Sequence, residues 1–232
     1  MAKSIFTLQI IAYISVIPML LYASWHHYLI AILFYFLFGC LGMILGYHRL
    51  HSHRSFETPS WFEKLITLFA TMSLTGPAID WVAIHRAHHK WHDTEKDPHS
   101  PDHMGRFRVH FMTMFSEVSP KFAMDLIRTP FYMWQRKYYF YIIAAYAAIL
   151  YLIDPLAVVY AWLFPAFLTV FLGTLILSTS HREGKAHDDF LLGILTWGDA
   201  FHHTHHEKPM QNRLHKYDIS GWIIETFFKV KA

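Results

Sequence analysis

The chain has 232 residues, of which 54% are hydrophobic and 18% are aromatic, whereas only 16% are charged. This composition is too apolar for an ordinary water-soluble domain and favours an integral membrane protein. The net charge of +3, spread among acidic residues, argues against nucleic-acid binding, and the single cysteine, Cys40, excludes a disulfide framework or a cysteine-rich metal site.

Four segments meet or approach the length of about 20 mostly apolar residues that a transmembrane helix needs. The connection between the first two segments, and that between the last two, is short and contains no Lys or Arg, so we expect two helical hairpins. The predicted fold is therefore an all-α membrane protein with spans at residues 5–22, 28–46, 138–153 and 156–177.

The basic residues outside these hairpins predict the orientation. By the positive-inside rule, both termini and segments 47–137 and 178–232 face the cytoplasm, where we expect them to form a helical cap within a single domain, residues 1–232. Residues 65–84 are also apolar, but they contain Gly76, Pro77 and Asp80. A span there would separate His48 from His85, so we expect an interfacial or re-entrant segment.

Nineteen histidines are present, and they form clusters outside the apolar segments. In GYHRLHSHRSF, His48 and His53 are five residues apart and would point in different directions on an α-helix. They would therefore serve two metals, unless one of them lies beyond the helix end. The clusters IHRAHHKWHD and FHHTHHEKP each place three histidines at i, i+3 and i+4, on one helix face: His85, His88 and His89, and His202, His205 and His206.

These clusters predict metal binding. Imidazole binds Zn, Cu, Fe and Ni, so the ligand type does not select the metal, but eight or more histidines exceed the four ligands of a structural zinc site and indicate two ions. His181, at the end of the fourth predicted span, is a further candidate. We expect the other histidines of these regions to be solvated or to support the ligands: His51, His92, His99, His103, His187, His203 and His215.

Several charged residues adjoin the clusters. Asp80 and Asp199 precede the second and third clusters closely enough to accept an imidazole N–H, although either could be a helix cap. Arg49, Arg54 and Arg86 could hold an anionic substrate headgroup or be ordinary cations at the membrane surface.

The motifs H-R-x-x-S-H-R-S, H-R-A-H-H-K and F-H-x-x-H-H resemble the three histidine boxes of membrane fatty-acid desaturases, above all of the Δ9, stearoyl-CoA type. The resemblance covers about residues 41–222. It implies nine metal ligands: His48, His53, His85, His88, His89, His181, His202, His205 and His206. It also implies two irons, O2 as co-substrate, and a cis double bond, at Δ9, formed in a long-chain acyl-CoA, acyl-carrier protein or acyl-lipid substrate.

The resemblance carries further expectations. An H-P-G-G motif of a fused cytochrome b5 domain is absent from the sequence, so electrons would come from an external donor such as ferredoxin or cytochrome b5. The acyl chain would enter a tunnel lined by the second and fourth helices and by Trp81, one helical turn before His85. Animal members of the family have an Asn one turn before the ninth ligand that helps to hold a water near one iron, whereas this chain has Leu177.

Two alternatives remain. A di-iron hydroxylase or alkane monooxygenase uses similar histidine boxes but adds oxygen to the chain. A metal-transport or haem-binding membrane protein would require ionisable residues at mid-membrane or histidine pairs inside the spans, and the predicted spans have neither.

Overall fold

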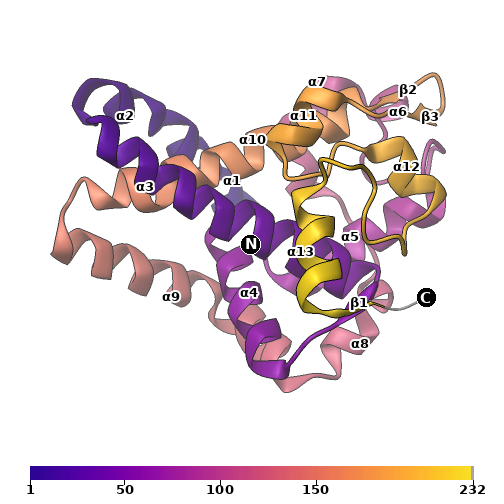
Figure 1. Ribbon diagram of the computed structural model, residues 1–232, viewed down its shortest axis with the longest axis horizontal. Coiled ribbons are helices and arrows are strands. Elements are labelled where there is room, and N and C mark those ends of the chain that lie inside the picture. The colour runs from indigo at the N-terminus through magenta and orange to yellow at the C-terminus, as the bar shows by residue number, and fades with distance from the viewer. Residues whose placement is uncertain (231–232) are drawn as a thin grey trace.

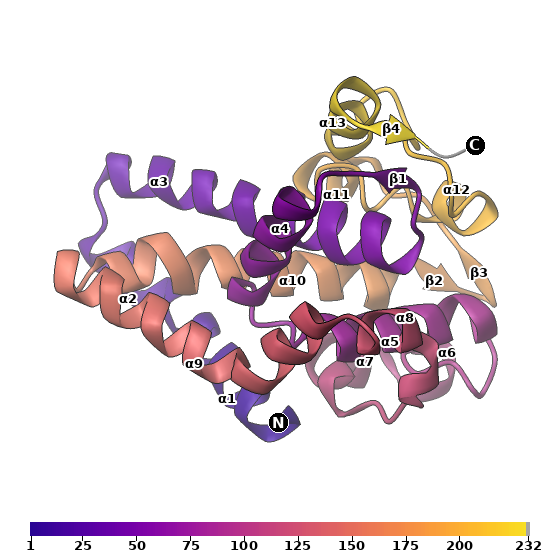
Figure 2. The ribbon, with the colours of Figure 1, turned by 90° about the horizontal axis from the view of Figure 1, so that it is seen from below.

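The computed structural model describes residues 1–230, and helices predominate in this part of the chain, as the sequence predicts. The long helices extend to one side, and most of the short helices gather at the opposite end (Figures 1 and 2). The first arm comprises α1 (Ala2–Ile14) and α2 (Val16–Tyr22). The helix is interrupted between them because Pro18 has no amide hydrogen to donate to the carbonyl of Ile14.

The first hairpin returns through α3 (Trp25–Tyr35), which continues into the π-helix η1 (Phe36–Ser52). The second hairpin comprises α9 (Pro130–Ile153), the π-helical turn η4 (Val159–Leu163) and α10 (Phe164–Thr179). In the tight connection between its arms, Asp154 Oδ1 accepts a hydrogen bond from the Leu156 amide at 3.0 Å.

Three helical stretches in the described chain are long and apolar enough to cross a membrane: Ala2–Tyr22, Trp25–Ser52 and Val159–Thr179. They coincide with three of the four predicted spans. The remaining one, residues 138–153, lies within α9, which has 24 residues but carries Arg136 and Lys137. It is not among the three stretches, so the expected count of four spans is not established.

Residues 65–84 do not form one helix. The chain runs through α4 (Ser60–Met72), breaks, and continues in α5 (Ala78–Trp91). At the break, Leu74 and Gly76 have φ values of 63° and 103°, and Pro77 precedes α5. Polar side chains from neighbouring helices complete the hydrogen bonds there, since Tyr139 Oη accepts from the Gly76 amide at 3.1 Å and Trp162 donates to the Met72 carbonyl at 3.0 Å.

Helix α4 lies directly against η1. The contact depends on Gly42, because a Cβ at this position would lie 2.5 Å from the Ala70 backbone nitrogen. This close approach places the end of η1 beside α5, where two of the histidine clusters lie.

The remaining elements of segments 47–137 and 178–230 are short. The helices among them are α6 (Pro101–Met104), α7 (Arg106–Met112), η2 (Thr113–Phe115), η3 (Pro120–Ala123), α8 (Met124–Ile127), α11 (Phe190–Leu195), α12 (His202–Glu207) and α13 (Ile219–Phe227). Two antiparallel strand pairs join distant or adjacent segments: β1 (Phe56–Glu57) with β4 (Lys229–Val230), and β2 (His181–Arg182) with β3 (Lys185–Ala186). The first pair fastens the C-terminal segment beside the first histidine cluster.

Candidate metal centre

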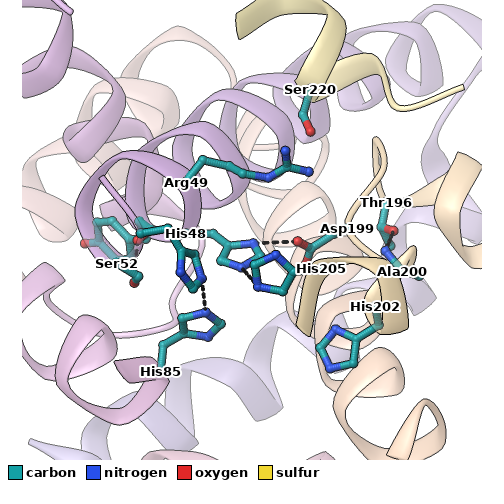
Figure 3. A network of polar contacts seen from close by, with 12 residues as sticks. His48, Arg49, Ser52, His85, Thr196, Asp199, Ala200, His202, His205 and Ser220 are labelled. Atoms are coloured by element: carbon teal, nitrogen blue, oxygen red, sulfur yellow. Dashed lines mark hydrogen bonds and ion pairs between the residues drawn. The ribbon is translucent and has the colours of Figure 1, made fainter. Parts of the chain in front are cut away.

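The nine histidines of the expected ligand set converge at the end of η1, although they come from five places in the chain. They form two groups, in each of which one ring nitrogen of every member lies within 4.8 Å of the others. Figure 3 shows part of this convergence, with the rings of His48 and His205 side by side and their Nε2 atoms 2.9 Å apart. The groups are His48, His53, His85, His89 and His205, and His88, His181, His202 and His206.

The placement of His48 and His53 differs from the expectation that they serve two metals. Both lie in the five-histidine group. The physical reason is the π-helical winding of η1, in which the amide of His53 donates to the carbonyl of His48 at 3.2 Å. A π-helix brings residues i and i+5 almost into line. His53 also lies just beyond the last residue of the helix, as the alternative interpretation allowed.

The histidines at positions i, i+3 and i+4 of α5 and of α12 are divided between the two groups. His85 and His89, four residues apart, belong to the five-histidine group, whereas His88 belongs to the other. On α12, His202 and His206 remain together and His205 joins the five-histidine group. Each of these two helices therefore spans both groups.

The distances between ring nitrogens fit metal coordination. In the five-histidine group, Nε2 of His205 lies 2.9 Å from that of His48 and 3.0 Å from that of His89, and the His53–His85 separation is 2.9 Å. In the four-histidine group, the Nε2 separations from His202 are 2.8 Å to His181 and 3.1 Å to His206. Two ligands at right angles, each ~2.1 Å from an ion, would be ~3.0 Å apart.

Three carboxylates determine which ring nitrogen carries the proton. His48 Nδ1 lies 2.7 Å from Asp199 Oδ1, and the Nδ1 atoms of His88 and His181 each lie 2.9 Å from a carboxylate oxygen, of Asp97 and Asp93 respectively. An ionised carboxylate only accepts, so Nδ1 carries the hydrogen and the Nε2 lone pair faces the other rings. If the partner rings also turn their Nε2 lone pairs inward, these lone pairs would repel one another unless a cation lay between them, which favours a metal site.

Burial keeps these imidazoles neutral. Burial first, and then neighbouring histidines such as His48, together lower the pKa of His89 to about 3. The pKa values of His85, His88, His202 and His205 also lie well below 6.5, again mainly because of burial. A metal-binding histidine must be unprotonated. These five histidines are therefore in the required form at neutral pH.

The expectations for the two aspartates have different outcomes. Asp199 accepts from His48, whereas Asp80 binds Arg136, with Nε to Oδ1 at 2.9 Å, on the partly exposed side of α5. The expected contact of Asp80 with an imidazole is therefore wrong. Sequence reasoning missed Asp93 and Asp97, which lie in the turn after α5; their position close after the second cluster was the available signal.

All three arginines have internal partners. Arg49 is fully buried, its Nη2 lies 3.0 Å from Asp218 Oδ2, and it also binds the Asn212 carbonyl. Arg86 binds both carboxylate oxygens of Asp125, at 2.7 and 3.0 Å. Neither guanidinium is available to a headgroup, which corrects that expectation for Arg49 and Arg86. Arg54 also pairs with Asp125, but its side chain is 57% exposed.

A cavity reaches both histidine groups. Its lining includes His48, His85 and His202 at the candidate centre, and Met43 of η1 and Val170 of α10 farther along. Trp81 also lines it, stacked on His85 with ring centroids 4.9 Å apart and planes at 10°. Leu177 contributes an apolar side chain to the same wall. Residues of the second and fourth predicted spans and Trp81 thus line one cavity, and its use as a substrate tunnel stays a prediction.

Residues 23–219 match the model of the fatty acid desaturase family. The chain is 32% identical to the sn-1 stearoyl-lipid 9-desaturase of Anabaena variabilis and 31% identical to the sn-2 palmitoyl-lipid 9-desaturase of Nostoc sp. (strain 36), and each comparison covers 87% of this chain and 78% of the relative. It is also 29% identical to the acyl-CoA C20 Delta5-desaturase of Anemone leveillei, over 88% of this chain and 69% of that protein.

Proposed function

The chain belongs to the fatty acid desaturase family and is an acyl desaturase, and we propose that its nine converging histidines hold two iron ions that serve the O2-dependent desaturation of a long-chain acyl group. One observation carries the proposal: the Nε2 lone pairs of buried, neutral imidazoles face one another in two adjacent groups. The five-histidine group would hold one ion and the four-histidine group the other.

The reaction needs an oxidising metal pair, because a methylene of an acyl chain has no acidic hydrogen for a general base to remove. Iron and O2 would supply that oxidation. The protein contributes position: the cavity between η1 and α10 would hold the chain with one C–C bond beside the centre. The carboxylates of Asp93, Asp97 and Asp199 orient three imidazoles, and burial keeps the rings neutral.

We further propose that the product is a cis alkene at Δ9, which the names of the two cyanobacterial relatives support. The carrier is a separate question, since one of these relatives is named for a stearoyl lipid and the Anemone leveillei protein for acyl-CoA. We propose an external electron donor, ferredoxin or cytochrome b5, that meets the cap on the cytoplasmic side. The basic residues outside the apolar stretches support this orientation.

Trp81 is proposed to contact the substrate. It lines the cavity and is stacked on the imidazole of His85, so an acyl chain close to the centre would contact it. We expect Trp81→Ala to keep its iron and lose turnover. Full turnover in this variant would remove Trp81 from the substrate contacts.

Expression in a host that makes no unsaturated fatty acids tests the function. We expect cis-9 alkenes in its lipids, mapped by mass spectrometry of double-bond adducts, and none with His88→Ala. An alcohol without an alkene would favour a hydroxylase or alkane monooxygenase. A Soret band in the purified protein would favour the haem-binding alternative.

A further inference from the structure

His99 is a buried histidine outside the nine-histidine set. Only 4% of it is exposed, and neither of its ring nitrogens has a hydrogen-bond partner in the described structure. A buried polar group without a partner destabilises the folded state, because it has lost its hydrogen bonds to water. His99 is therefore not solvated, one of the two expectations for it. The other, that it supports the ligands, stays open, and its two nitrogens require an explanation.

The position of His99 is tied to the four-histidine group. Its ring centroid lies 4.2 Å from that of His88, and a ring nitrogen lies within 4.8 Å of one of His88. Its amide donates to Asp97 Oδ1 at 3.0 Å, the same oxygen that faces His88 Nδ1 at 2.9 Å. One carboxylate thus fixes both the imidazole of His88 and the backbone of His99.

His99 is too far from the rest of the group to be one of its ligands. It shares close ring-nitrogen contacts with His88, but it is not within 4.8 Å of all of His181, His202 and His206. It lines the cavity that also reaches His202. A single water would bridge such a gap, provided that the water has further polar partners.

We propose that His99 is a positioning residue that holds a water on the metal ion of the four-histidine group, which has one imidazole fewer than the other. This inference rests on the proposed two-metal centre. The water would make up for the missing nitrogen on the side facing the cavity, and either His99 nitrogen could bind it, since a neutral imidazole offers one donor and one acceptor.

Metal binding and Mössbauer spectroscopy test this assignment without measuring turnover. The purified full chain and its variants would be loaded with iron-57(II) alone. We expect two ions per wild-type chain, and in His99→Leu a change in the spectrum of one ion, with its affinity reduced by about 10–100-fold. His99→Gln, which keeps a polar group, should retain both ions. His203→Leu is the matched control, because His203 is exposed and lies on α12 beside His202.

The outcomes separate the two proposals. A wild-type chain that binds fewer than two ions overturns the two-metal centre and the role of His99 with it. If the wild type binds two ions, and His99→Leu binds both with unchanged affinity and spectra, the role of His99 alone is overturned. If His99→Leu does not fold, His99→Gln decides, since we expect it to alter the spectrum of one ion only, and two unaltered spectra overturn the assignment.

Discussion

The Oδ1 atom of Asp199 lies 2.7 Å from Nδ1 of His48, although the two residues are 151 positions apart in the chain (Figure 3). The contact fixes the first histidine of the five-histidine group from the loop that precedes α12. The role of Asp199 can be tested against a matched control. Asp80 also precedes a histidine cluster, but it binds Arg136 and not an imidazole.

We expect Asp199→Asn to lower the affinity of the five-histidine group for iron by about 10–100-fold, because an amide stabilises the required tautomer less well than a carboxylate. Asp80→Asn is the control, since it removes only an exposed ion pair. Iron titration of both proteins measures the difference. Equal affinities would show that Asp199 does not support a metal ligand.

Metal removal should destabilise the protein, because the facing lone pairs then repel one another. A metal present at 100 times its dissociation constant stabilises the folded state by about 2.7 kcal/mol. We expect a chelator to lower the melting temperature and abolish turnover. Iron(II) should restore both, whereas Zn²⁺, which has no redox chemistry, should restore the melting temperature alone. Turnover with Zn²⁺ would contradict the oxidative function.

Acidic pH should destabilise the metal-free protein. Burial holds the pKa values of His85, His88 and His205 well below the 6.5 of an exposed histidine. Below pH 6.5 the unfolded chain therefore binds more protons than the folded one, and the free energy of unfolding falls as the pH falls, by up to about 1.4 kcal/mol per histidine and pH unit. Denaturation of metal-free protein at pH 5 to 8 tests this. A flat profile would mean that these rings protonate in the folded state.

Arg49→Leu should destabilise the fold by about 3–5 kcal/mol, because it leaves the carboxylate of Asp218 buried without its cation. The double variant Arg49→Leu, Asp218→Asn should recover part of this loss. Arg213→Leu is the control, since its ion pair with Glu225 is partly exposed and worth at most about 1 kcal/mol. Denaturant titration gives all three values, and a loss no greater than that of the control would contradict the buried pair.

Gly173 should control the length of acyl chain that the cavity accepts. It lines the cavity, and a Cβ built on it meets no atom within 4 Å. We therefore expect Gly173→Leu to fold and to keep its metal while its products shift towards shorter acyl chains. Gly42→Leu should instead fail to fold, because its Cβ would collide with the backbone of α4. Unchanged products from Gly173→Leu would place the chain elsewhere.

The shared orientation of the histidines within one cluster was predictable, because it depends on the local periodicity of the helix. Residues at i, i+3 and i+4 share a face of any α-helix, so His85, His88 and His89 point together before any tertiary contact is known. The distribution of these residues over two groups was not predictable. It depends on how α5 faces α12. The alignment of His48 with His53 depends on a π-helical winding that has no signature in the sequence.

The polar partners were less predictable than the ligands. Arg49 and Arg54 look alike in the sequence, yet Arg49 is fully buried against Asp218 and the side chain of Arg54 is 57% exposed. What separates them is the return of the C-terminal segment 169 positions later, a contact without a local signature. The pairing of Asp97 with His88 likewise depends on the path of a turn.

The distribution of the nine histidines along the chain has a consequence for biogenesis. Each group combines early histidines with histidines of α12, more than a hundred positions later. His48 faces His205 in the five-histidine group, and His88 faces His206 in the four-histidine group. Half of the chain alone therefore cannot provide a complete coordination shell. The polypeptide must be synthesised to residue 205 before the five-histidine group is complete, and to residue 206 before the four-histidine group is, so loading of the proposed irons would be a late event in the maturation of this protein.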